Sequence, residues 1–495
     1  MAKILFIHPN KQGHGITAIW IPSHYSVLKS KGHDVRLFDC TFYKDWTINE
    51  TDFNTNNMMY KPSKYSNFVQ FNSNDIVKDL QAEIDNYHPD IIFWSALSSH
   101  IHGEGEYVSI EYGYELTKQI KCTAKRISGG LQTTASPVRM YDKFPAIDYF
   151  ISGESEFVLA DIADNINSPE KIKSLDGVTY KKNNIPITNS RQQIISNMDE
   201  LPLYDYSLFN EMVFFRPYNG KVLKGVDVEF SRGCPYTCSY CVETVIQNYY
   251  GFTDTGNNGV LKQASNYLRN KSAPRVYNEI KKLYEEHGIT LFRCQDTNFL
   301  SNNRMVLNQL ADFIQNDDLP ILLYIETRPE TINDKNIDLL KRLKVDGVGM
   351  GIELASESFR KSNLNRYPSQ EKIIKAFTLL NEAGIKRTTY NILGLPNETE
   401  EMIIETIEFN RLLQPDNMTV SFFSPYLGTP EQKKAESIGD FSSYEFNMDD
   451  QVRTVSKSTK IDKKLLEFYK ENFVRLVKNG TDEISMLKRE ARLTF

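Results

Sequence analysis

The sequence predicts an α/β protein in which a doubly wound parallel sheet is followed by a partial barrel of six strand–helix units and a helical C-terminal region. Two observations support this prediction. Short apolar runs alternate with amphipathic helical periods over residues 1–165 and again over residues 226–430, and such alternation is typical of parallel sheets. The length of 495 residues also suits about three domains of ordinary size.

The front region, residues 1–165, contains the expected doubly wound sheet. Its strand at Asp90–Ser95 is a nearly continuous apolar run, and the helix at Asp75–Tyr87 has apolar residues at helical spacing. Sheets of this kind bind ligands on the loops at the carboxyl ends of their strands. The other expected elements are strands at Lys3–His8, Asp34–Phe38, Arg126–Ser128 and Tyr149–Ser152, a helix ending at Gly32, and a helix over Tyr112–Ile120.

Residues 166–225 interrupt this alternation and are expected to connect two domains. A small hairpin is predicted between Gly177 and Ile187, because Asn183 and Asn184 place a polar turn between two apolar runs.

Residues 226–430 supply the barrel, with six units where a complete barrel has eight. Its helices have ordinary boundary signals: Ser369 precedes one of them and Gly384 ends it. The stretch 247–273 has no place in the pattern, and residues 431–495 form a helical appendix. The six expected strands are Val226–Phe230, Ile289–Arg293, Ile321–Thr327, Val348–Glu353, Thr388–Leu393 and Thr419–Phe423.

Composition narrows the class of protein. The net charge of −6 is small for this length and argues against a nucleic-acid partner, which requires a basic face. Apolar residues at 40% and charged residues at 25% are ordinary for a soluble globular chain. No apolar run is long enough for a membrane span, and six cysteines are too few for a disulfide scaffold. A cytoplasmic protein acting on a small molecule is therefore expected.

Three of the cysteines, Cys234, Cys238 and Cys241, lie within eight residues directly after the first barrel strand. Barrels place their active sites at this end. Three thiolates on one loop can ligate three corners of an iron–sulfur cluster and leave the fourth iron open to a substrate or cofactor. A structural zinc site is the alternative, but it usually needs four ligands, and the next cysteine is Cys294.

The Cys-x3-Cys-x2-Cys loop after the first strand of a six-unit barrel resembles the radical S-adenosylmethionine (SAM) superfamily. The resemblance implies a 4Fe–4S cluster on the three cysteines as metal ligands. It also implies that SAM chelates the open iron and is cleaved by one electron to methionine and a 5′-deoxyadenosyl radical. An electron donor such as flavodoxin or ferredoxin is implied as a partner.

The same resemblance implies SAM-binding positions at the ends of successive strands. Arg328 suits the SAM carboxylate, and Glu353 suits its ribose or ammonium group. The alternative for these two residues is an ordinary ion pair with each other. The alternative for Gly394, a further implied contact, is a simple turn. The implied cofactor contacts in the barrel are Tyr240, Asp296, Arg328, Glu353 and Gly394.

The front region is similar to the cobalamin-binding domain that precedes the barrel in one radical SAM subgroup. The motifs on which this similarity rests include Lys3–Pro9, Gly32–Asp39 and Ile151–Glu156. The histidine motif Asp-x-His-x-x-Gly of many cobalamin domains is absent, which leaves His14, His100 and His102 as weak axial candidates and a cobalamin-free scaffold as an alternative. The implied cobalamin contacts are Ser95, Ser98, Gly129, Gly130 and Glu154.

The resulting functional hypothesis is a cobalamin-dependent radical SAM methyltransferase that methylates an unactivated carbon of a small molecule. A related radical rearrangement, cyclisation or heteroatom exchange is the first alternative. A methylthiotransferase is disfavoured because it needs three further cysteines before the barrel, where this chain has only Cys40 and Cys122. A non-enzymatic, metal-held binding module is the remaining alternative.

Overall fold

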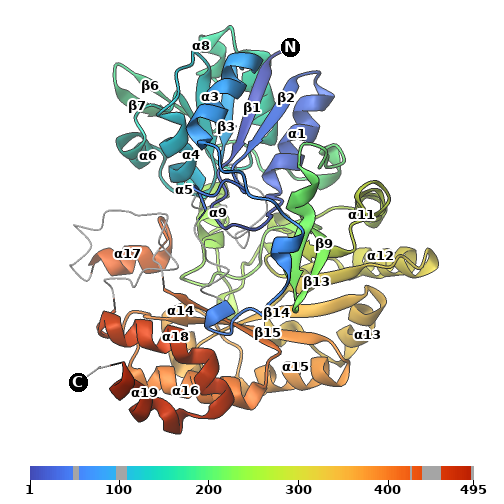
Figure 1. Cartoon of the computed structure of the whole chain (residues 1–495), viewed down its shortest axis with the longest axis vertical. Helices are drawn as coiled ribbons and strands as arrows, with labels where there is room; N and C mark the ends of the chain where they lie inside the picture. Colours follow the sequence, from blue (N-terminus) through green and yellow to red (C-terminus); the bar gives the residue numbers. More distant parts are fainter. Residues whose placement is uncertain (48–54, 96–108, 424–425, 438–458, 492–495) are drawn as a thin grey trace.

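The computed structural model describes residues 1–47, 55–95, 109–423, 426–437 and 459–491. Two seven-stranded sheets organise the chain, one in the front region and one in the barrel (Figure 1). The α/β class expected from the sequence is confirmed. In the described residues, no helix is both long and apolar enough to cross a membrane.

The front sheet has the strand order β2-β1-β3-β4-β5-β6-β7. Its first five strands are parallel in the order of flavodoxin-like sheets, in which the switch point between β1 and β3 opens a crevice. The strands are β1 (Lys3–His8), β2 (Asp34–Asp39), β3 (Ile91–Trp94), β4 (Lys125–Gly129), β5 (Tyr149–Ile151), β6 (Val178–Lys182) and β7 (Ile185–Thr188). The helices are α1 (Trp20–Ser30), α3 (Ile76–Tyr87), α4 (Ser109–Thr117), α5 (Leu131–Ala135), α6 (Pro137–Lys143), α7 (Glu156–Asp164) and α8 (Pro169–Ile172).

Two details of the front region differ from the expectation. The hairpin expected between residues 177 and 187 forms as β6 and β7, but it joins the front sheet because β6 pairs with β5. The helix expected to reach Ile120 ends at Thr117, where the Arg126 guanidinium binds the carbonyl oxygens of both residues. The connector therefore contributes two strands to the front sheet.

The second sheet has the order β16-β15-β14-β13-β12-β9-β8, and its six parallel strands are the six expected from the sequence. A seventh strand, β8, pairs antiparallel with β9 and was not predicted. The strands are β8 (Phe215–Tyr218), β9 (Lys221–Val228), β12 (Leu291–Cys294), β13 (Leu322–Glu326), β14 (Val345–Glu353), β15 (Lys386–Leu393) and β16 (Asn417–Phe422). The helices between them are α11 (Ala273–His287), α12 (Arg304–Asn316), α13 (Asp334–Arg342), α14 (Glu357–Leu364), α15 (Gln370–Glu382) and α16 (Glu400–Leu413).

The partial barrel has an opening between β8 and β16, and a segment of the front region lies across it. We call residues 58–62 the strap; in Figure 1 they belong to the blue segment that descends onto the barrel. Met59 of the strap is 3% exposed and packs with β16 and with α18 (Lys463–Asn479). Beside it, the Asn417 side chain donates a hydrogen bond to Asn219 at 3.1 Å, which joins the two edges.

The stretch 247–273, unplaced by the sequence, folds around the cysteine loop. It contains the end of α9 (Glu243–Tyr250), α10 (Ala264–Tyr267) and β11 (Arg269–Asn270), and β11 pairs with β10 (Ser231–Arg232) just before the first cysteine. In the expected C-terminal appendix, the described residues form α17 (Pro430–Ser437), α18 and α19 (Ile484–Glu490).

A buried ionic cluster joins the front sheet to the barrel. We call it the junction network: Glu154 and Glu156 from the front region, and Glu229, Arg232 and Arg269 from the barrel. The Arg232 side chain is 1% exposed and lies 2.6 Å from Glu156 and 2.9 Å from Glu229. Arg269 donates to both oxygens of Glu154, at 2.7 and 2.9 Å. Although Glu156 is fully buried, the charge of Arg232 keeps its pKa below the ordinary value.

The junction network yields a stability prediction. Glu156→Gln should lower the free energy of unfolding by about 3–5 kcal/mol, because it leaves part of the buried Arg232 charge uncompensated. Urea denaturation measures this change. Glu170→Gln is the control: Glu170 pairs with Lys173 on the surface, so no measurable change is expected. Equal effects of the two substitutions would show that the junction network carries no special stability.

Candidate active site

A cavity of about 480 Å³ lies at the carboxyl ends of the barrel strands and extends into the barrel. Its wall includes the three clustered cysteines, side chains from the barrel strands, and residues of the front region. The front region contributes His14 from the loop after β1 and residues 59–61 of the strap. The barrel therefore does not enclose the cavity alone.

The cysteine loop is fixed by hydrogen bonds from the segment that follows it. Gln247 on α9 donates to the backbone carbonyls of Cys234 and Tyr236, each at 2.9 Å. Glu243 accepts the backbone N–H of Cys234 at 3.0 Å and the hydroxyl of Tyr267 at 2.5 Å. Burial raises the pKa of Glu243 to about 7. These contacts hold the backbone of the loop and leave its sulfur atoms to the cavity.

The chemistry of the loop suits a cluster better than a single ion. Cys234, Cys238 and Cys241 all line the cavity, and all are free thiols. Within the described residues, no three Cys, His, Asp or Glu side chains converge on one metal ion. A cluster does not require such convergence, because each thiolate binds a different iron. Burial raises the pKa of the Cys234 and Cys241 thiols, so metal binding would have to displace their protons.

Arg328 reaches the cysteine loop as the sequence predicts for a cofactor-binding position. Its guanidinium donates to the sulfur of Cys238 at 3.3 Å and lies 3.7 Å from the ring centre of Tyr236. Glu330 accepts from the same guanidinium at 2.6 Å. A delocalised cation beside the cysteines is suited to bind a carboxylate in two-point contact.

Glu353 lies at the carboxyl end of β14 in a left-handed backbone conformation, with φ of 63°. Its Oε1 accepts a hydrogen bond from the Tyr240 hydroxyl at 2.8 Å and lies 3.7 Å from the Arg366 guanidinium. The alternative considered for these residues, an ion pair between Glu353 and Arg328, is not among the contacts of the described residues; Arg366 lies near Glu353 and Glu330 pairs with Arg328. A non-glycine residue held at positive φ is costly, and such residues cluster at ligand sites. Burial and the Glu353 charge raise the pKa of Tyr240 well above its ordinary value.

Asp296 and Gly394 take positions away from the cavity wall. Asp296 is completely buried, and its carboxylate accepts hydrogen bonds from the Phe230 backbone, the Ser231 hydroxyl and the Asn302 amide. It therefore anchors the start of the cysteine loop. The Gly394 backbone N–H is bound to Glu398 at 2.6 Å.

Three predicted cobalamin contacts meet at the carboxyl ends of β3 and β4. Ser95 has a positive φ of 57°, and among the described residues its buried Oγ has no hydrogen-bond partner. Gly130 has φ of 116°, and a β-carbon there would lie 2.8 Å from the Ser95 carbonyl oxygen. Gly129 precedes it at the end of β4. An orphaned hydroxyl beside a glycine backbone is an arrangement that fits a bound ligand with amide groups.

The Glu154 carboxylate, a predicted cobalamin contact, is already hydrogen-bonded within the protein. It is engaged by Arg269 and by the Ile195 backbone N–H at 3.1 Å, so its observed role is in the junction network. Ser98, His100 and His102 lie outside the described residues.

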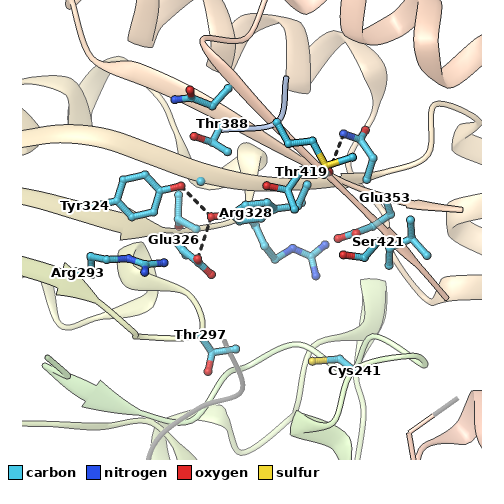
Figure 2. A pocket seen from close by; sticks show the side chains of 18 of the residues that line it. Cys241, Arg293, Thr297, Tyr324, Glu326, Arg328, Glu353, Thr388, Thr419 and Ser421 are labelled. Atoms are coloured by element: carbon cyan, nitrogen blue, oxygen red, sulfur yellow. Dashed lines mark hydrogen bonds between the residues drawn. The ribbon is translucent and has the colours of Figure 1, made fainter. Parts of the chain in front are cut away.

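A polar set of side chains inside the barrel was not predicted from the sequence. Figure 2 shows Arg293, Tyr324, Glu326, Thr388, Thr419 and Ser421 around the cavity, with Cys241 across the open space. These residues recur at every second position of their strands, so they share the inner face of the sheet. The alternation of polar and apolar residues in β13 and β16 was the available signal.

Glycines at alternate positions of β14 leave room for this polar set. A β-carbon at Gly349 would lie 2.4 Å from the Tyr390 hydroxyl oxygen and 2.8 Å from that of Tyr324. The Tyr390 hydroxyl is bound to Tyr324 at 2.8 Å and to Glu326 at 2.9 Å. The absent side chain at Gly349 therefore permits this hydrogen-bonded chain.

Comparison with known proteins agrees with this geometry. Residues 228–409 match the family model of the Radical SAM superfamily. An uncharacterized methyltransferase of Pyrococcus horikoshii is 25% identical over 354 residues, covering 71% of this chain and 70% of that protein. The anaerobic magnesium-protoporphyrin IX monomethyl ester cyclase of Rubrivivax gelatinosus is 22% identical over 491 residues, covering 96% of this chain and 78% of the cyclase.

Solved structures extend the likeness to the front region. The radical S-adenosylmethionine methyltransferase TsrM of Kitasatospora setae, with cobalamin and a 4Fe–4S cluster bound, has a TM-score of 0.64 at 18% identity. The match covers 88% of this chain and 78% of TsrM. The cobalamin-dependent S-adenosylmethionine radical enzyme OxsB has a TM-score of 0.59 at 13% identity, covering 88% of this chain and 61% of OxsB.

The fold and the family match define a radical SAM domain preceded by a flavodoxin-like front region. The match to the family model is confined to residues 228–409, and the overall fold of the chain is similar to the folds of TsrM and OxsB.

The glycine at position 349 gives a prediction about the barrel interior. Gly349→Ala should destabilise the protein by about 1–3 kcal/mol, because the new methyl group displaces the two tyrosine hydroxyls. Urea denaturation measures the loss. Gly256→Ala is the matched control, since a β-carbon there meets no atom closer than 3.5 Å. Comparable losses in both variants would refute the steric argument.

Glu398 gives a prediction about pH. Burial raises its pKa to about 8, against 4.5 for an ordinary glutamate, although its Oε2 accepts the backbone N–H groups of Gly394 and Leu395. Between these pH values the folded chain holds a proton that the unfolded chain has lost. The free energy of unfolding therefore falls as pH rises through this window.

Glu398→Gln keeps an acceptor oxygen and removes the titration. Relative to this variant, the wild type should lose on the order of 3 kcal/mol of unfolding free energy between pH 4.5 and 8. Denaturation at a series of pH values measures the difference. Glu401→Gln, at an exposed position with a lowered pKa, should leave the slope between pH 5 and 8 unchanged. Parallel pH profiles for wild type and Glu398→Gln would contradict the assignment.

Proposed function

We propose that this protein is a cobalamin-dependent radical SAM methyltransferase that methylates an unactivated carbon of a small molecule. The observation that carries the proposal is the cysteine loop: three thiols line one cavity at the carboxyl end of a partial barrel, with the Arg328 guanidinium on one sulfur. The front region, with its flavodoxin-like strand order, supports the cobalamin part.

The chain offers separate groups for each cofactor. Cys234, Cys238 and Cys241 would hold a 4Fe–4S cluster, and Arg328 would pair with the SAM carboxylate. Tyr240 and Glu353, joined by their hydrogen bond, would receive the SAM ribose or ammonium. Ser95 and the glycines at 129 and 130 would contact cobalamin.

Asp296, Gly394 and Glu154 have supporting roles in the proposed site. Asp296 positions the cysteine loop through Ser231, and Glu154 holds the β11 segment through Arg269. The Gly394 backbone N–H is bound to Glu398, so Gly394 holds the turn after β15, and the adenine contact expected there would fall to the neighbouring Ile392, which lines the cavity.

When bound, the cluster supplies the electron that cleaves SAM, and cobalamin supplies a carrier for the methyl group. The chain itself orients these groups and excludes water. The strap covers the opening between β8 and β16, and Met59 fills it with an apolar side chain. A closed cavity protects reactive intermediates from solvent.

A second candidate function is a radical cyclisation or rearrangement without methyl transfer. It is favoured by the likeness to the anaerobic cyclase, which extends over 96% of this chain. The two functions share every residue named above and differ in their product. In both, the expected partners are a small-molecule substrate and an electron donor such as flavodoxin or ferredoxin. The net charge of −6 supports the absence of a nucleic-acid partner.

Anaerobic reconstitution with iron, sulfide and hydroxocobalamin tests the proposal. After addition of reductant and SAM, the wild type should form 5′-deoxyadenosine and retain both iron and cobalamin. Cys238→Ala should abolish 5′-deoxyadenosine formation, because one of the three ligands is lost. Iron analysis, visible spectra and mass spectrometry measure these outcomes.

Cys122→Ala is the control, because Cys122 is a free thiol in the front region outside the cavity wall. An intact cluster without 5′-deoxyadenosine would exclude the radical function. A protein that forms 5′-deoxyadenosine but retains no cobalamin would exclude methyl transfer through cobalt. A product without an added methyl group would favour the second candidate.

A further inference from the structure

We propose that the barrel interior binds a small molecule that is rich in hydroxyl groups and carries little net charge. This inference rests on the proposed function, because it concerns the substrate end of the same cavity. It concerns the part of the cavity lined by β12, β13, β15 and β16, away from the cysteines.

The inner face of these strands is unusual for a barrel. Barrel interiors are normally filled by branched apolar side chains. Here the inward positions of β13 are Tyr324 and Glu326, and those of β16 are Asn417, Thr419 and Ser421. Their alternate neighbours on both strands are buried apolar residues. The polar residues face the cavity, and of these apolar neighbours Phe422, at the end of β16, also contributes to the cavity wall. A wall of this kind is costly to desolvate unless a ligand supplies hydrogen bonds.

The hydrogen-bonding groups of the wall match alcohols in particular. The hydroxyls of Thr388, Thr419 and Ser421 can each donate and accept, as an alcohol group does. The Tyr324–Tyr390–Glu326 chain presents a further run of hydroxyl and carboxylate groups. The two tyrosine rings also offer flat apolar surfaces to the carbon face of such a molecule.

The charges of the interior favour a ligand with little net charge. Arg293 on β12 and Glu326 on β13 are the charged side chains on the inner face of those strands, and they offset one another. The other arginines of the wall are ion-paired: Arg216 with Asp227, Arg328 with Glu330 and Arg366 with Glu353. Lys61 of the strap adds one further positive charge, so a polyanion would meet only a small excess of cations. A large apolar molecule such as a tetrapyrrole would bury the hydroxyls of β15 and β16 without partners.

The glycines of β14 open the space for this ligand. A side chain at Gly347 or Gly349 would collide with Tyr324, and one at Gly349 also with Tyr390. The tyrosines therefore stand against bare backbone, and their hydroxyls reach the cavity.

Ligand retention tests the inference with the reconstituted protein. The probes are three fractions of a metabolite extract from anaerobically grown cells: neutral polar, strongly anionic, and organic-soluble. The protein is incubated with each fraction and washed by ultrafiltration, and the released compounds are identified by mass spectrometry. The wild type should retain a neutral, multiply hydroxylated compound from the first fraction.

Two substitutions in the wall should weaken that retention by about tenfold or more: Glu326→Gln and, independently, Tyr390→Phe. Tyr277→Phe is the matched control, because its hydroxyl binds Asp317 on the protein surface. Thermal denaturation of each variant checks folding. If one of the two wall variants does not fold, the other still tests the inference.

Retention from only the anionic or the organic-soluble fraction would overturn the inference. So would equal retention by the wild type and both wall variants, or no neutral polar compound retained above the level of a protein-free blank. Formation of 5′-deoxyadenosine without any extract reports the proposed function separately, so the failure of one proposal is distinguishable from the failure of the other.

Discussion

The contact on which the rest of the structure depends is the buried pairing of Arg232 with carboxylates from both halves of the chain. Arg232 lies two residues before the first cysteine of the loop, and Glu156 reaches it from the front sheet. A buried guanidinium is tolerable only while its partners stay in place. The cysteine loop is thereby fixed relative to the front sheet. The proposed function requires such a junction, because a cofactor held by one half would have to face a cofactor held by the other.

The order of elements and the cysteine loop could be predicted because their signals are local. Apolar periodicity located all six parallel barrel strands, and the spacing of Cys234, Cys238 and Cys241 identified the loop. Arg328 and Glu353 were predicted as cofactor contacts from the resemblance to the radical SAM superfamily, and both line the cavity. Asp296 was predicted from the same resemblance, but its carboxylate binds the Phe230 backbone instead of facing the cavity.

The remaining features depend on contacts between distant residues, which one sequence does not specify. Glu154 was expected to bind a cofactor, but its partner Arg269 lies more than a hundred residues away in a stretch without periodicity. The strap has no helical or strand pattern, and Met59 acquires its role only from α18 and β16. The sequence shows the alternation of polar and apolar residues along β13 and β16. It does not show which face of the sheet points into the barrel, so a polar cavity wall could not be predicted from it.

The strap has a consequence for how such proteins can diversify. Because residues of the front region form part of the wall of the barrel cavity, the two halves are not interchangeable modules. A front region transplanted from another protein would place a different side chain, or no side chain, in the opening between β8 and β16 that Met59 fills here. A chimera of this architecture must therefore carry its own strap with its own barrel if the wall of the cavity is to stay intact.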